Sequence, residues 1–136
     1  MSFRVYVPTS LDALARYAEE GGIGPSPVHG HAVTQWLRDS WPEADEEEWA
    51  YAALMAAADQ SAAGLTGGQR PRRVVLVAEV ERVTADREST AVTVDSAIAL
   101  RLLQAVHADT ADIDPASEDA GDLAWFGVQE IPDLLA

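Results

Sequence analysis

Cysteine and lysine are both missing from this chain of 136 residues. Without cysteine the protein has no disulfide, no thiolate nucleophile and no sulfur ligand for a metal. Any metal site must therefore use histidine and carboxylate ligands, and we expect no cofactor. No apolar run is long enough to cross a bilayer, and no signal-like leader precedes the first strand-like segment. The sequence thus predicts a cytoplasmic protein with no membrane partner.

Positive charge is scarce, because nine arginines face 23 acidic side chains and leave a net charge of −14. Such a field repels phosphate groups, so we expect no nucleic-acid partner. It maintains solubility and also attracts positively charged partners. The hydrophobic fraction of 48% is ordinary for a globular protein. A chain of this length is expected to form a single domain, residues 1–136, with a real core.

Apolar patterning predicts an α+β fold, with a mixed sheet of four to six strands packed against two to four helices. The expected strands cover residues 3–7, 74–78, 91–94 and 124–131. The expected helices cover residues 10–20, 35–38, 45–63 and 96–104. The run at 74–78 is rich in β-branched residues without alternation, which is typical of a central strand covered on both faces. Residues 105–109 fit a helix or a strand, because so short a run has no decisive period.

The helix expected over 45–63 begins with four acidic residues, where the helix dipole and free amides favour negative charge. The rest of this helix is alanine-rich, and its apolar stripe is wider than one face. A helix of this kind is covered on most sides, either by its own fold or by a second copy of the chain. Trp36, Trp41 and Trp49 are expected in the core, with an exposed patch for a partner or a second subunit as the alternative.

Motifs for nucleophilic catalysis and phosphate binding are missing. The chain has no Gly-x-Ser-x-Gly sequence. The glycine-rich residues 64–68 lack the lysine of a P-loop and precede a strand instead of a helix. Arg70, Arg72 and Arg73 form the basic cluster of the chain, and we expect them to pair with the surplus of carboxylates.

Three histidines carry what metal or acid–base chemistry the sequence offers. His29 and His31 are two residues apart, as are His107 and Asp109, and on a strand this spacing points both members to one face. If the two pairs met, they would form a nitrogen–oxygen metal shell. We predict instead hydrogen-bonded structural histidines and no metal site, because no specific ligand frame is present. Glu130, expected within the last strand, is either an acid–base carboxylate or a solvent-facing edge residue.

Short motifs are spread along nearly the whole chain. They are Arg4-Val5-Tyr6-Val7-Pro8, His31-Ala32-Val33-Thr34, Asp45-Glu46-Glu47-Glu48 with Tyr51-Ala52-Ala53-Leu54, the strand at 73–79, Val106-His107-Ala108-Asp109, and Gln129-Glu130-Ile131-Pro132-Asp133-Leu134-Leu135. Together they resemble a family of short actinobacterial proteins classed as domain of unknown function 6912. The resemblance implies one cytoplasmic domain and no established activity, cofactor or ligand. It also implies four polar residues to test, which are His31, His107, Asp109 and Glu130.

Two function hypotheses follow from these observations. The first is a non-enzymatic interaction or regulatory module that binds a protein partner or self-associates into a homo-oligomer. The alternative is a small enzyme or metal-binding protein that uses His31, His107, Asp109 and Glu130. The alternative requires these side chains to converge in a concave pocket, whereas the first hypothesis leaves them apart or hydrogen-bonded to the fold.

Overall fold

An antiparallel sheet of seven strands forms the centre of the fold, with strand order β5-β6-β3-β1-β4-β8-β9. The computed structural model describes residues 2–116 and 121–136. The strands are β1 (Phe3–Thr9), β3 (Val28–His31), β4 (Val74–Val80), β5 (Thr84–Ala85), β6 (Ala91–Val94), β8 (Leu103–Ala108) and β9 (Ala124–Phe126). A separate two-stranded sheet pairs β2 (Gly22–Ile23) with β7 (Ile98–Ala99). The fold is therefore α+β, as the sequence predicts.

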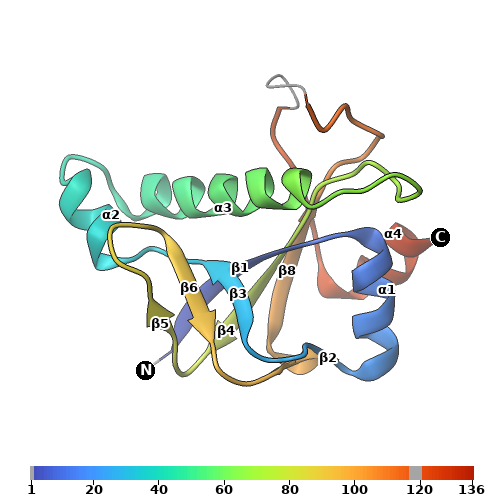
Figure 1. The fold of residues 1–136 in the computed structure, drawn as a ribbon, viewed down its shortest axis with the longest axis horizontal. Helices are drawn as coiled ribbons and strands as arrows, with labels where there is room; N and C mark the ends of the chain where they lie inside the picture. The colour runs from blue at the N-terminus through green and yellow to red at the C-terminus, as the bar shows by residue number, and fades with distance from the viewer. Residues whose placement is uncertain (1, 117–120) are drawn as a thin grey trace.

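Four helices surround this sheet. They are α1 (Leu11–Glu20), α2 (Gln35–Ser40), α3 (Glu46–Ala63) and α4 (Ile131–Leu135), with short 3-10 turns η1 (Leu100–Leu102) and η2 (Val128–Glu130). Figure 1 shows α3 lying along one side of the sheet with α2 beside its start, while α1 and α4 lie together at the opposite end of the molecule. None of the described helices combines the length and the apolar character that a membrane crossing requires.

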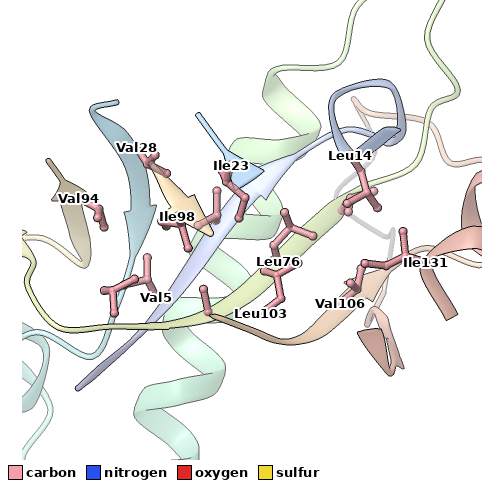
Figure 2. Packing of buried hydrophobic residues seen from close by; sticks show 14 of the residues in the cluster. Val5, Leu14, Ile23, Val28, Leu76, Val94, Ile98, Leu103, Val106 and Ile131 are labelled. Carbon is pink, nitrogen blue, oxygen red and sulfur yellow. The ribbon is translucent and has the colours of Figure 1, made fainter. Parts of the chain in front are cut away.

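Strand alternation divides the core into two parts, because successive side chains point to opposite faces of the sheet. On the α3 side, the small residues Ala53, Ala57 and Ala58 pack against the sheet. The sheet residues they meet are Tyr6, Val75, Val77 and Ala105. The other side holds the larger cluster, in which Figure 2 shows Ile131 beside Val106 at one end and Val94 at the other. Helices α1 and α4 cover this second side with Leu11, Leu14 and Ile131.

Side-chain caps explain where three predicted helices begin. Asp45 accepts a hydrogen bond from the Glu48 amide at 2.9 Å, and the Glu48 carboxylate accepts one from the Asp45 amide at 3.3 Å. This reciprocal pair satisfies amides that the first turn of α3 leaves free. Thr34 caps α2 by accepting a hydrogen bond from the Leu37 amide, and Ser10 caps α1 by accepting one from the Ala13 amide. The helices expected over 10–20, 35–38 and 45–63 are confirmed, as is the central strand at 74–78.

The helix expected over 96–104 is wrong, because strand pairing takes its residues. Ile98 pairs with Ile23 in the two-stranded sheet, and Leu103 pairs with Ala78 in the large sheet. Only the turn η1 remains between them. The open question about residues 105–109 is answered by β8, which is a strand through Ala108. Tertiary pairing has overridden a local pattern that is compatible with a helix.

The last expected strand is confirmed only over β9, since the chain then turns through η2 into α4. The Glu130 carboxylate accepts a hydrogen bond from the Gly127 amide at 2.7 Å and closes this turn. Pro132 lies in the first turn of α4, where a missing amide donor costs little. Ile131 reaches the core with 7% of its surface exposed. The C-terminal segment is thus anchored by a helix and not by a longer strand.

The large sheet also differs from the expected mixed sheet of four to six strands. All its recorded strand pairs are antiparallel, and it has seven strands. The extra strands include β5, whose two residues pair with β6 and are too few for a periodic pattern. β1 runs through Pro8 to Thr9, because its pairing with β4 continues to Val74.

Gly30 marks a close approach between β3 and β1. A Cβ atom at this position would lie 2.7 Å from Val5 Cγ1 and 2.9 Å from the Tyr6 carbonyl oxygen. We expect Gly30→Ala to lower the free energy of unfolding by about 1–3 kcal/mol in urea denaturation. Gly67→Ala is the matched control, because nothing lies within 4 Å of its Cβ position. Equal stability of the two variants would contradict this account of the β3 contact.

Candidate functional site

The polar residues that the sequence singles out do not share one site. His31 lies on β3 and His107 on β8, and β1 and β4 lie between them. Three strand spacings, about 14 Å, therefore separate the two histidines across the sheet. Glu130 ends η2, whose neighbours Val128 and Ile131 pack on the face opposite α3. The sheet order thus separates His31 from His107.

Asp109 is held by Arg73 in a buried ion pair. The Asp109 carboxylate accepts hydrogen bonds from Arg73 Nε at 3.0 Å, Arg73 Nη2 at 2.8 Å and the Arg73 amide at 2.8 Å. The two side chains are only 4% and 5% exposed. Hydrogen bonding to Asp109 raises the pKa of Arg73 against the opposing effect of burial. Arg72 pairs with Asp112 at 3.0 Å, so the predicted pairing with carboxylates is confirmed for Arg72 and Arg73.

The histidines occupy different surroundings. The ring of His31 makes hydrogen bonds to Thr90 Oγ1 at 2.9 Å and to Gln60 Oε1 at 2.6 Å. It therefore ties β3 to α3 and to the turn before β6. His29 is exposed on the same face of β3, whereas His107 is half-buried and burial lowers its pKa. The described residues contain no group of three or more histidines and carboxylates placed to hold a metal ion.

The tryptophans of residues 36–49 lie at the surface, so their expected place in the core is wrong. Trp36 is 39% exposed, Trp41 is 38% exposed and Trp49 is half-buried. Trp49 Nε1 donates a hydrogen bond to the Trp41 carbonyl at 3.0 Å, and the Arg38 guanidinium lies 4.8 Å from the centre of the Trp49 ring. Helix α2 lies at the end of the molecule, away from the sheet centre (Figure 1). We call these three tryptophans the tryptophan surface.

In the described part of the chain, the side of α3 that faces the sheet is buried, and Met55 packs against that core. Ala52 and Ala56 are half-buried, and Tyr51 is 51% exposed. The Tyr51 hydroxyl donates a hydrogen bond to Asp122 at 2.6 Å. Alanine side chains let α3 pack closely on the sheet. On the outer side of the helix, the same small side chains expose little apolar surface for another protein layer to cover. Coverage of the outer side by another copy stays a prediction.

A cavity of about 430 Å³ lies between strand β1 and the first turns of helix α3, and we call it the α3 cavity. Tyr6, which is only 5% exposed, lines it together with Ala50. Burial raises the pKa of Tyr6, while the neighbouring Arg4 opposes this rise. The charged residues of its lining are Arg4, Arg38, Glu46, Glu47 and Glu79.

No motif in the sequence indicates this cluster of charges. Alternation on β1 and β4 places Arg4, Tyr6 and Glu79 on one face, but that signal does not say which charges meet. A larger cavity of about 700 Å³ lies at the ends of β4 and β6. Its lining includes Glu81, Arg82, Asp95 and Arg101, all of which are exposed, and it lacks a buried polar side chain such as Tyr6.

These features define an α+β protein with an antiparallel sheet, a structural ion pair and an exposed aromatic surface. A family model described as Family of unknown function (DUF6912) matches residues 3–135, and the chain therefore belongs to this family. The chain matches no curated protein and no solved structure.

The buried Arg73–Asp109 pair should contribute more to the free energy of unfolding than the exposed Arg72–Asp112 pair. We expect Asp109→Ala to lower the free energy of unfolding by about 3–5 kcal/mol, because it removes the carboxylate that accepts three hydrogen bonds from the buried Arg73. Asp112→Ala removes the exposed partner of Arg72 and should cost no more than about 1 kcal/mol. Urea denaturation of both variants measures the difference. A cost for Asp109→Ala as small as that for Asp112→Ala would show that the pair is not structural.

His107 should make the fold less stable in acid. Its pKa in the folded chain lies below the ordinary value of 6.5, so the unfolded chain binds more protons as the pH falls. Stability is therefore full above the unfolded pKa and declines as the pH falls through 6.5 toward the folded pKa. We expect His107→Gln to reduce the drop in Tm between about pH 7.5 and pH 5. His29→Gln at the exposed position is the control, and an unchanged drop in both variants would refute the assignment.

Proposed function

We propose that this protein is a non-enzymatic interaction module, located in the cytoplasm, whose tryptophan surface binds an arginine-rich segment of a partner protein. The observation that carries the proposal is the exposure of Trp36 and Trp41, each with more than a third of its surface in solvent. Aromatic side chains, tryptophan above all, supply much of the binding energy of protein interfaces. The hydrogen bond from Trp49 to the Trp41 carbonyl holds two of the three tryptophans together before any partner arrives.

The charge around the tryptophan surface selects the partner. Residues 36–49 contain six carboxylates and one arginine, and the whole chain carries a net charge of −14. A negative field of this kind speeds encounters with positive segments and disfavours nucleic acids and anionic membranes. A second copy of the chain would bring the same negative charge to the contact. A basic partner therefore fits this surface better than self-association does.

The chain already binds one guanidinium at this surface. Arg38 lies over the Trp49 ring at 4.8 Å, and its Nη1 lies 2.6 Å from Glu46 Oε1. A planar guanidinium can stack on an aromatic ring and donate to a carboxylate at the same time, which a lysine ammonium does less well. This internal contact supports arginine as the residue that the partner presents.

The enzyme alternative has less support. His31 is hydrogen-bonded to Thr90 and Gln60, and Asp109 is committed to Arg73. Glu130 closes a turn by accepting the Gly127 amide. Each of these polar groups has a structural partner, and no described cavity brings them together.

An octapeptide of arginine is the direct probe of this proposal. We expect it to bind, and Trp36→Ala and Trp41→Ala each to weaken its binding at least about fivefold in isothermal titration calorimetry, because each removes about 1 kcal/mol or more of contact. Trp125→Ala is the matched control, since Trp125 is 62% exposed on the distant strand β9.

Three outcomes would refute the proposal. They are a lack of binding, equal weakening by all three variants, and equal affinity for an octapeptide of glutamate. Light scattering without peptide tests whether a second copy of the chain binds the tryptophan surface instead. A dimer that Trp36→Ala dissociates would assign the tryptophan surface to a second copy of the chain.

A further inference from the structure

The α3 cavity adjoins the tryptophan surface at Trp49, because Arg38 lies over the Trp49 ring and also lines the cavity. The same Arg38 side chain pairs with Glu46. A partner segment that reaches Trp49 would therefore lie near the cavity. The charge and the lining residues of the cavity determine which chemical group can bind there.

We infer that one arginine side chain of the partner segment enters the α3 cavity and is bound there by the carboxylate of Glu47, the acidic residue of the lining that has no ion pair in the described part of the chain. This inference rests on the proposed function and names the contact that would give it specificity. It assigns a ligand class, a guanidinium on an apolar stem, to a cavity of about 430 Å³.

The charge balance of the lining favours one additional cation. Arg4 pairs with Glu79 at 3.3 Å, and Arg38 pairs with Glu46 at 2.6 Å. Glu47 is the third carboxylate, and within the described part of the chain it has no ion pair, which leaves the lining with a net charge of −1. The positive end of the α3 dipole offsets this by at most about half a charge, and the Asp45 cap already shares that end.

The walls of the cavity suit the stem of an arginine. Phe3, Ala32, Val33 and Ala50 present apolar surface along which three methylene groups can lie. Tyr6 also lines the cavity, and only 5% of its surface is exposed to solvent. Long cationic side chains commonly bury an apolar stem and keep the charged end among polar groups.

An anion is a poorer occupant of this cavity. To reach Arg4 or Arg38 it would have to displace Glu79 or Glu46 from an existing ion pair. It would also approach Glu47, and like charges brought together cost binding energy. Both arginines of the lining are therefore already paired with carboxylates of the chain.

N-acetyl-arginine amide tests the cavity without the rest of the partner. We expect this probe to shift the methyl resonance of Ala32, which lines the cavity, in NMR titrations, while N-acetyl-glutamate amide does not. Glu47→Gln should weaken the response at least about threefold, since it removes the carboxylate without an ion pair. Glu43→Gln is the matched control, because it removes the same charge from a residue outside the cavity lining. Equal weakening by both variants, or a response to the glutamate probe alone, would overturn the inference.

Ala50→Leu provides an independent test, because it adds bulk to the cavity wall without changing charge. We expect it to remove most of the Ala32 response to N-acetyl-arginine amide, and an unchanged response would refute the cavity assignment. The arginine octapeptide separates this inference from the proposed function. If its binding depends on Trp36 but not on Glu47 or Ala50, the inference is wrong and the proposed function stands. If Glu47→Gln weakens it and Trp36→Ala does not, the cavity binds arginine and the proposed function is wrong.

Discussion

The contact on which the rest of the structure depends is the ion pair between Arg73 and Asp109. Arg73 stands just before β4 and Asp109 just after β8, so the pair closes the end of the ladder whose last recorded rung joins Val74 and Ala108. The Asp109 amide also donates to the Arg73 carbonyl at 3.1 Å. A buried charge without its partner is costly, and this cost disfavours other registers of β4 against β8. With β4 placed, β1 pairs along its other edge over the full length of both strands.

The surface that we propose for binding is a consequence of how α3 sits on this sheet. Ala53, Ala57 and Ala58 bring the helix close to the strands because their side chains are small. The start of α3 then lies at the end of the molecule beside α2 (Figure 1). Trp36 and Trp41 are on this side of the fold, where less of the sheet is available to cover them. The same geometry leaves the α3 cavity between the first helical turn and β1.

Sequence reasoning worked best where local chemistry decides the outcome. The cap at Asp45 and the β-branched run at 74–78 each specify an element without help from distant residues. It was wrong where a distant strand competes for the same residues, as for Ile98, which pairs with Ile23. It was also wrong for the tryptophans, because a large aromatic residue favours burial in general but only the position of α2 decides whether burial is available.

By itself, the sequence determined the α+β class and the starts of the main helices, because periodicity and capping depend on neighbouring residues. It also determined the net negative charge, which follows from composition, and the family, which follows from motifs along the chain. Only the tertiary structure decided which polar groups meet. It placed His31 and His107 on strands separated by β1 and β4, and it joined Asp109 to Arg73. It also gathered the charges of the α3 cavity from residues as far apart in sequence as Arg4 and Glu79. The physical reason is that strand order and helix placement depend on the burial of the whole core, which no short segment encodes.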